Sequence, residues 1–192
     1  LVGSMGKTTT TMLITSVFNA AGYNVWSCSS LANNLVSETI IDGIVTGKAQ
    51  NCDIAIFELP HGTLGLLNKL DIKIGVLSYL TKEHLNEFGG SYEKYLLRQL
   101  IIQDISETFI ANSECANETD LLSDDTIFYT MDVDVDFKGT MGDKSLTVTY
   151  DEGEFTTPFH MMSYFFENAV GAAAVGINYG ISEDDIIKAL ST

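Results

Sequence analysis

Basic side chains are scarce in this 192-residue chain, which carries 10 lysines and arginines against 26 aspartates and glutamates and a formal charge of −16. Such a field repels phosphate backbones and anionic lipid surfaces, and no run of about 18 apolar residues is present, so we expect neither a nucleic acid nor a membrane as a partner. Only two prolines occur, and no linker-like tract divides the sequence. With 45% hydrophobic residues, the composition predicts one globular domain.

Cysteines are equally few. Cys28, Cys52 and Cys115 are widely spaced and form no CxxC pair. The pattern is atypical of a disulfide framework or a zinc site and indicates reduced thiols, as in cytoplasmic proteins. The chain also begins at Leu1, without a methionine or a lead-in to its first glycine loop. We therefore expect an N-terminal boundary that was cut from a longer chain.

Apolar runs alternate with helical patterns along the first two thirds of the sequence. The run at residues 53–59 is apolar almost throughout, which is typical of a strand buried on both faces of a parallel sheet. The alternation predicts an α/β fold whose mostly parallel sheet is flanked by helices. The expected strands are residues 23–26, 53–59, 72–79 and 108–111, and the expected helices are residues 8–21, 37–46 and 91–104.

The pattern changes near residue 127. Short alternating segments separated by glycine turns predict a small antiparallel meander at residues 127–159. An alanine-rich helix is expected at residues 168–179, with Gly180 as its C-terminal cap. Ser182 has the pattern of an N-cap for a last helix that ends near Leu190.

The most informative segment is the loop GSMGKT at residues 3–8, which opens into the helix near Thr9. Glycines allow successive backbone N–H groups to turn inward on an anion, and the helix dipole adds attraction for phosphate. The following Lys7 would reach the outer phosphates, and the Thr8 hydroxyl would bind Mg²⁺. The pattern predicts a nucleotide site of the P-loop NTPase type, the alternative being a structural glycine turn.

A second candidate for this site is Glu58, at the carboxyl end of the strand predicted at residues 53–59. Ligands of open parallel sheets bind just beyond the carboxyl ends of the strands, where a carboxylate can hold Mg²⁺ directly or through water. The alternative is a solvated carboxylate at the end of a strand.

The order of motifs over nearly the whole chain resembles the central ATPase domain of the ATP-dependent Mur ligases, which form amides in cell-wall peptide synthesis. GSMGKTTT at residues 3–10 is similar to the family's G-T-x-G-K-T-T-T loop, and DIAIFE at residues 53–58 to its second strand. The resemblance implies ATP and Mg²⁺ as cofactors, with catalytic roles for Lys7 and Glu58. The residues implied to contact ATP are Gly3, Ser4, Met5, Gly6, Lys7, Thr8, Thr9 and Asn168.

Two later motifs extend the resemblance. LSYLTKEHLNEFGGSYEKY at residues 77–95 looks like T-N-x-x-x-D-H-L-D-x-H-G-S-x-x-x-Y, which places His84 on the family's catalytic, metal-binding histidine. The alternative is a histidine that caps the next segment. NAVGAAAVG at residues 168–176 resembles the helix whose leading asparagine, here Asn168, contacts adenine, although an alanine-rich helix is by default a packed core helix. Residues 180–190 are similar to the end of the central domain, so domains flanking it in the full-length protein are expected partners.

Three departures indicate a divergent branch. Many members carry a carbamylated lysine that bridges metal ions four residues after the tyrosine that matches Tyr95, and here that residue is Gln99. The family's His-Asn pair before the adenine-contacting asparagine is replaced by Tyr164 and Phe165, and Glu58 is followed by LPHG at residues 59–62 in place of a serine-rich turn.

The resemblance implies a ligase in which a substrate carboxylate attacks the γ-phosphate of ATP and an amine then displaces phosphate from the acyl phosphate. Lys7 would stabilise phosphate charge, Thr8 and Glu58 would hold Mg²⁺, and His84 would support a metal ion or the acyl-phosphate oxygens. The alternatives are a P-loop ATPase switch and a regulatory homologue that binds nucleotide without ligase chemistry. Pseudomurein peptide, muramate–alanine and tetrapyrrole-coenzyme ligases all fit, and the resemblance favours a cell-wall peptide precursor as the small-molecule or peptide substrate.

Overall fold

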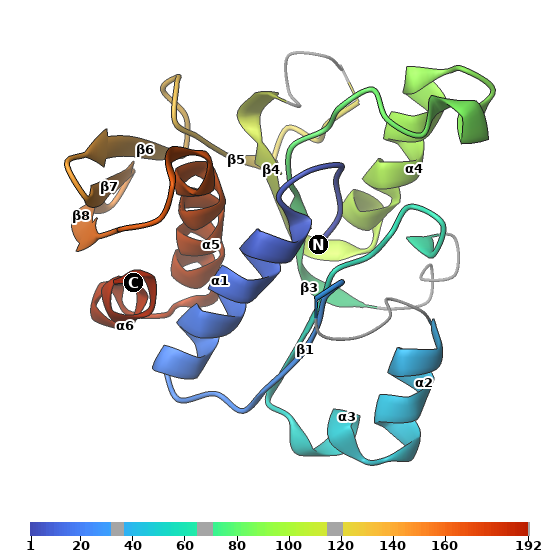
Figure 1. Cartoon of the computed structure of the whole chain (residues 1–192), viewed down its shortest axis with the longest axis horizontal. Helices are drawn as coiled ribbons and strands as arrows, with labels where there is room; N and C mark the ends of the chain where they lie inside the picture. Colours follow the sequence, from blue (N-terminus) through green and yellow to red (C-terminus); the bar gives the residue numbers. More distant parts are fainter. Residues whose placement is uncertain (32–36, 65–70, 115–120, 192) are drawn as a thin grey trace.

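The computed structural model describes residues 1–31, 37–64, 71–114 and 121–191. Strands and helices are interspersed up to β4, after which the strands β5 to β8 follow one another and two helices end the chain (Figure 1). The helices are α1 (Lys7–Ala20), α2 (Ser37–Val45), α3 (Lys48–Asn51), α4 (Tyr92–Asp104), α5 (Phe166–Tyr179) and α6 (Glu183–Leu190), with 3₁₀ turns η2 (Leu85–Phe88) and η4 (Ser163–Phe165). The strands are β1 (Val25–Cys28), β2 (Ile54–Phe57), β3 (Ile72–Leu77), β4 (Ser106–Asn112), β5 (Ile127–Thr130), β6 (Phe137–Gly142), β7 (Ser145–Tyr150) and β8 (Gly153–Pro158).

The strands form a six-stranded sheet in the order β3-β4-β5-β6-β7-β8 and a two-stranded parallel sheet of β1 and β2. The first two residues of the chain join them. Val2 bridges parallel to Leu77 at the end of β3, and the Leu59 N–H after β2 donates to the Leu1 carbonyl at 2.8 Å. The carboxyl ends of β2 and β3 therefore lie on either side of the start of the glycine loop.

Two hydrophobic cores lie on opposite faces of the sheet. Val76 and Ile110 belong to the core that contains α1, α5 and α6, whereas their neighbours Leu77 and Phe109 belong to the core beneath α4. Successive side chains of a strand point to opposite faces, so β3 and β4 contribute to both cores. Figure 1 shows α1 and α5 together on one side of β3 and α4 on the other. The predicted α/β architecture, with helices flanking a mostly parallel sheet, is confirmed.

The predicted caps at the C-terminal end are also present. Gly180 adopts a left-handed φ of 91° after α5, and the Ser182 side chain accepts a hydrogen bond from the Asp185 N–H at 3.3 Å before α6. Helix α5 packs through alanines that are completely buried, which allows α1 and the sheet to approach its backbone closely. This packing places the N-terminus of α5 beside the glycine loop.

The expectation of an antiparallel meander from residue 127 is wrong for its first strand. Strand β5 pairs parallel with both β4 and β6, and only β6, β7 and β8 are antiparallel. The three antiparallel strands also continue the main sheet and do not form a separate one. The short β5 has the alternating pattern of a meander. It nevertheless pairs parallel with Ile110, Ala111 and Asn112 of β4, which are distant in sequence.

Three smaller expectations concern the burial of β2, the state of the cysteines and membrane-spanning helices. Strand β2 is not buried on both faces, because Ala55 is exposed. Cys28 is buried and Cys52 is half-buried, and both are free thiols, while Cys115 lies outside the described residues. Within the described part of the chain, no helix is both long and apolar enough to cross a membrane.

Candidate functional site

The glycine loop runs from Val2 into α1 along the carboxyl edge of the parallel strands. Two of its residues must be glycine for steric reasons. Gly3 and Gly6 have φ angles of 133° and 82°, which side-chain-bearing residues rarely adopt. A Cβ atom on Gly3 would also collide with Ser78 Oγ, and one on Gly6 would collide with Asn168 Oδ1. The loop is therefore held tightly between the end of β3 and the start of α5.

The backbone amides of the loop differ from the expected arrangement. The Ser4 and Met5 N–H groups donate to the Tyr79 carbonyl at 2.9 and 3.1 Å, so they shape the loop and do not point toward an anion. The available donors lie further along, because the first N–H groups of α1, at Lys7, Thr8 and Thr9, have no acceptor within the helix. These donors and the positive end of the helix dipole form the anion-attracting part of the loop.

The ammonium group of Lys7 folds back over the loop. Its Nζ donates to the carbonyl oxygens of Gly3 at 2.8 Å and Ser4 at 3.0 Å. Burial lowers the pKa of Lys7, while the nearby carboxylates of Glu58 and Glu83 act in the opposite direction. A cation that is partly desolvated and held by neutral carbonyls gains much from an anionic partner, because the charged form then recovers the solvation lost on burial.

Thr8 and Glu58 meet at the opposite side of the helix start. Thr8 Oγ1 donates to Glu58 Oε2 at 2.8 Å, and the Ser30 N–H donates to the same oxygen at 3.1 Å. The Glu58 side chain is buried, and Ser30 Oγ lies 2.7 Å from Thr8 Oγ1. Adjacent ligands of an octahedral Mg²⁺ ion at 2.0–2.1 Å lie about 3 Å apart, so this oxygen pair has the chemistry and spacing of a magnesium site.

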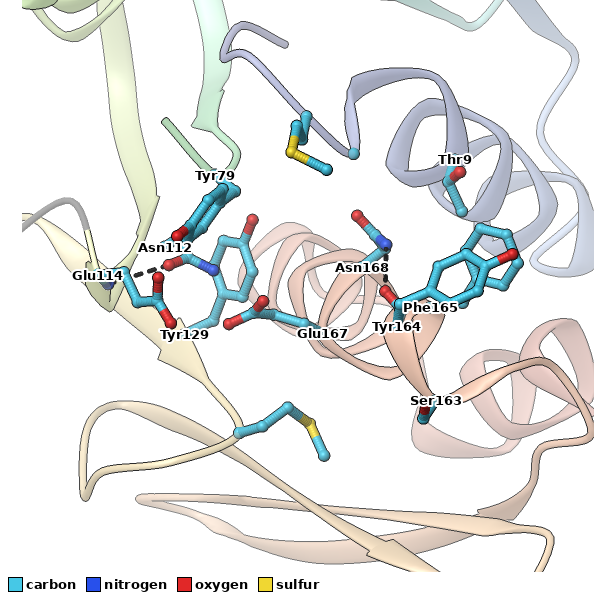
Figure 2. A pocket seen from close by; sticks show the side chains of 13 residues that line it. Thr9, Tyr79, Asn112, Glu114, Tyr129, Ser163, Tyr164, Phe165, Glu167 and Asn168 are labelled. Carbon is cyan, nitrogen blue, oxygen red and sulfur yellow. Dashed lines mark hydrogen bonds between the residues drawn. The ribbon is translucent and has the colours of Figure 1, made fainter. Parts of the chain in front are cut away.

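Asn168 joins the glycine loop to α5. Its Oδ1 accepts from Thr10 Oγ1 at 3.0 Å, and its Nδ2 donates to the Tyr164 carbonyl at 3.2 Å. A pocket of about 540 Å³ opens beside it. Figure 2 shows Asn168 and Glu167 at the start of α5, with the Glu167 side chain directed toward Asn112 and Tyr129. The lining includes Met5, Gly6 and Thr9, so the pocket is continuous with the glycine loop.

One wall of the pocket is acidic. Burial raises the pKa of Glu167, a hydrogen bond from the Asn112 side chain opposes this shift, and Glu114 and Asp132 reinforce it. The opposite wall carries the amide of Asn168 and the aromatic side chains of η4. A flat heterocycle with polar edges suits these walls, because the rings offer stacking surface and the amide and carboxyl groups offer hydrogen bonds.

His84 is not grouped with Thr8 and Glu58 in the described structure. Its Nδ1 lies 3.0 Å from Glu87 Oε1, and Glu87 Oε2 lies 2.9 Å from His61 Nε2. The three side chains form a group with possible metal-ligand spacing that involves neither Thr8 nor Glu58. The Thr81 N–H, three residues before His84, donates to Ser4 Oγ at 2.9 Å, so this segment nevertheless contacts the glycine loop. Sequence reasoning assigned no role to His61 or Glu87, although His61 follows Glu58 by three residues and Glu87 follows His84 by three.

Tyr95 is another site residue without a predicted role. It is almost completely buried, and its hydroxyl lies 2.8 Å from Ser4 Oγ, which also accepts from the Thr81 N–H at 2.9 Å. Ser4 therefore ties the loop to α4 and to the segment after β3. Ser4 and Tyr95 are 91 positions apart, so no local sequence pattern predicts their contact. The only signal in the sequence is that both residues belong to motifs of the resemblance.

Comparisons with known proteins identify the family and the fold of this chain. A family model described as the Mur ligase middle domain matches residues 1–176. The chain belongs to the Mur ligase family. A relative within the family is the UDP-N-acetylmuramoylalanine–D-glutamate ligase of Syntrophus aciditrophicus, which is 26% identical over 204 residues. The alignment covers 100% of this chain but 43% of that ligase, so the chain spans less than half the length of this relative.

Solved Mur ligase structures share the fold. A UDP-N-acetylmuramoyl-L-alanyl-D-glutamate–2,6-diaminopimelate ligase superposes with a TM-score of 0.81 at 18% identity, covering 99% of this chain and 45% of that one. A pseudomurein peptide ligase type C from Methanothermus fervidus gives a TM-score of 0.77 at 16% identity, covering 99% of this chain and 48% of that one. At these identities the likeness establishes the Mur ligase middle-domain fold alone.

The structure also locates the departures from the Mur ligase pattern. Gln99 is buried on α4, and within the described residues its Oε1 atom has no hydrogen-bond partner. Tyr164 and Phe165 form part of η4 and line the pocket beside Asn168. His61, from the divergent turn after Glu58, contacts Glu87. Two of the three departures thus lie at the candidate site, and the third is a polar group in the core beside Tyr95.

Proposed function

We propose that this chain is the ATP-binding middle domain of an ATP-dependent ligase that joins a carboxylate to an amine through an acyl phosphate. The observation that carries the proposal is the contact of Thr8 with the buried Glu58, next to Lys7 at the start of α1. Oxygen ligands for Mg²⁺, an ammonium group and free helix N–H groups converge there, as phosphoryl transfer requires.

Within this proposal each residue has a distinct task. Bound ATP would supply the phosphoryl group that activates the substrate carboxylate. Lys7 would leave the carbonyl groups of Gly3 and Ser4 and neutralise charge on the outer phosphates, while Thr8 and Glu58 would hold Mg²⁺. His84 would contribute a metal ligand on the side of the acyl phosphate. Most of the catalytic effect would come from positioning and charge neutralisation.

The pocket beside Asn168 is the proposed adenine site. It adjoins Gly6 and Thr9, so a base bound there would be continuous with phosphates at the start of α1. The substrates would be held largely by flanking domains of the full-length protein, and a cell-wall peptide precursor is the proposed carboxylate. The names of two similar proteins support this class, because one is a UDP-N-acetylmuramoylalanine–D-glutamate ligase and the other a pseudomurein peptide ligase.

The test of the reaction uses the full-length protein that contains this chain. ADP release is measured with Mg-ATP, with and without UDP-N-acetylmuramoyl-L-alanine or a pseudomurein peptide precursor as the carboxylate, and hydroxylamine is added to trap an acyl phosphate as the hydroxamate. We expect ADP release to depend on the carboxylate. Equal ADP release without any carboxylate would instead indicate an ATPase switch, and ATP binding without ADP release would indicate a regulatory homologue.

Replacing Asn168 with alanine tests the adenine site. The change removes an acceptor for Thr10 and a donor to Tyr164, at about 1 kcal/mol for each hydrogen bond, and removes the amide from the pocket wall. We expect roughly a tenfold loss of ATP affinity in isothermal titration calorimetry. Asn178→Ala is the matched control on the same helix, since Asn178 bonds only the Ala174 carbonyl in the described structure. Equal ATP affinities for the two variants would contradict the assignment.

A further inference from the structure

Three metal-ligating side chains meet outside the Thr8 and Glu58 pair. His61, His84 and Glu87 each present one ligand atom, and these atoms lie within 4.8 Å of one another. The carboxylate of Glu87 lies between the two imidazoles, 2.9 Å from one and 3.0 Å from the other. Hydrogen bonds from the two histidines lower the pKa of Glu87. The group therefore consists of an ionised carboxylate and two imidazole nitrogens that converge on one point.

The local fold explains the convergence. Glu87 lies in the 3₁₀ turn η2, and His84 is the N-cap of that turn with a left-handed φ of 55°. A 3₁₀ helix has about three residues per turn, so residues three apart share one side of it. His61 comes from the turn after β2, which lies next to the end of β3 through the bridging strand at Val2. Two loops at the carboxyl edge of the sheet thus supply the three ligands.

The spacing suits a tetrahedral or octahedral transition-metal ion. Ligand atoms about 2.1 Å from a zinc ion in tetrahedral geometry lie roughly 3.4 Å apart, and the three side chains present ligand atoms that lie within 4.8 Å of one another. Imidazole nitrogens favour later transition metals such as zinc and cobalt over magnesium, which prefers oxygen ligands. The side chains are 18%, 48% and 49% exposed for His61, His84 and Glu87, so one face of the group remains open to solvent.

We propose that His61, His84 and Glu87 bind one divalent transition-metal ion of the Zn²⁺ or Co²⁺ class, separate from the Mg²⁺ proposed at Thr8 and Glu58. This proposal rests on the proposed function only because both use His84 as a metal ligand. The other two ligands, His61 and Glu87, were assigned by no family motif. Three protein ligands and a solvent-exposed side leave coordination positions for water or a substrate oxygen, as in catalytic metal sites.

Tyr95 lies between the proposed metal site and the glycine loop and contacts both. The ring centroids of His61 and Tyr95 are 6.1 Å apart, and the Tyr95 hydroxyl contacts Ser4 Oγ at 2.8 Å. On the other side, Glu83 immediately precedes His84 and stabilises the charge of Lys7. A metal ion at the histidines would fix the segment that carries Glu83 and restrict the Tyr95 ring, and so order one side of the loop.

The test measures metal binding by the chain without nucleotide. Co²⁺ is titrated while its visible absorption is recorded, and Zn²⁺ is titrated by calorimetry in an excess of Mg²⁺. We expect one saturable site that Mg²⁺ does not displace, because imidazole nitrogens suit transition metals and Mg²⁺ prefers oxygen ligands. His61→Asn, His84→Asn and Glu87→Gln are each expected to lower Zn²⁺ affinity by on the order of 100-fold. Asparagine is chosen at position 84 because it tolerates the left-handed backbone found there.

Matched controls keep the outcome specific. His160→Asn changes the third histidine, which is exposed beyond β8, and Glu107→Gln changes an exposed carboxylate that pairs with Lys73; both are expected to bind Zn²⁺ normally. Lys7→Ala is also expected to bind Zn²⁺ normally, so loss of nucleotide binding and loss of metal binding are distinguishable. The proposal is overturned by the absence of saturable Zn²⁺ binding, by equal affinity in the His61 and His160 variants, or by a cobalt–thiolate charge-transfer band that places the metal on a cysteine.

Discussion

Replacing Lys7 with alanine is expected to abolish measurable ATP binding by this domain. The ammonium group already makes two charged hydrogen bonds, to Gly3 and Ser4, and the outer phosphates would replace those carbonyls as acceptors. A hydrogen bond to a charged group contributes about 1.5–3 kcal/mol, so the loss of two such bonds corresponds to at least about a 100-fold weaker affinity. Isothermal titration calorimetry with Mg-ATP measures the change directly.

The control for this prediction is Lys73→Ala. Lys73 is exposed on β3 and pairs with Glu107, so its removal changes the net charge by the same amount outside the candidate site. We expect its ATP affinity to match that of the unaltered chain, and circular dichroism to show that both variants are folded. An unchanged ATP affinity in Lys7→Ala would remove the basis for a phosphate-binding loop.

Glu58→Gln is expected to have the second large effect, on the dependence of ATP binding on Mg²⁺. The substitution preserves size but removes the negative charge, and its amide group would face the Ser30 N–H that now donates to the carboxylate. The loss of one carboxylate ligand, together with the contact between two N–H donors at Ser30, should raise the Mg²⁺ concentration required for half-maximal ATP binding by roughly 10-fold to 100-fold. A Mg²⁺ titration at fixed ATP measures the shift.

Two comparisons make this result specific to the Mg²⁺ site. Glu107→Gln removes an exposed carboxylate on β4 and should leave the titration unchanged. Thr8→Ser should retain the hydroxyl that contacts Glu58, whereas Thr8→Val should lose it and shift the titration in the same direction as Glu58→Gln. If the curves of Glu58→Gln and the unaltered chain coincide, Glu58 is a structural carboxylate and not a metal ligand.

Much of the secondary structure could be predicted because its causes are local. The observed helices and strands that were predicted begin and end within a few residues of their predicted bounds, from α1 to the Ser182 cap of α6. The phosphate-loop prediction was possible for the same reason. Its glycines, its lysine and its threonine are contiguous, and the sequence alone requires them to lie at the start of a helix.

The errors occur where pairing or contact depends on distant residues. The alternating pattern of β5 could not reveal a parallel partner on both sides, and the run containing Ala55 could not reveal an exposed face. Successive N–H groups of the loop were expected to face an anion, but those of Ser4 and Met5 donate to the Tyr79 carbonyl after β3. The β4 partner of β5 and the Tyr79 carbonyl are both distant in sequence from the residues that they contact.

The candidate site divides in the same way. The residue types and their order were sufficient to predict an α/β fold with a candidate phosphate loop, because the loop and the hydrophobic periods are encoded within short segments. The Mur ligase type was predicted from the resemblance of the motifs to that family. Only the tertiary structure pairs Thr8 with Glu58, places Asn168 against Gly6, and brings His61 to His84 and Glu87. These contacts arise because parallel strands align their carboxyl ends at one edge of the sheet, and that alignment is a property of the packed fold.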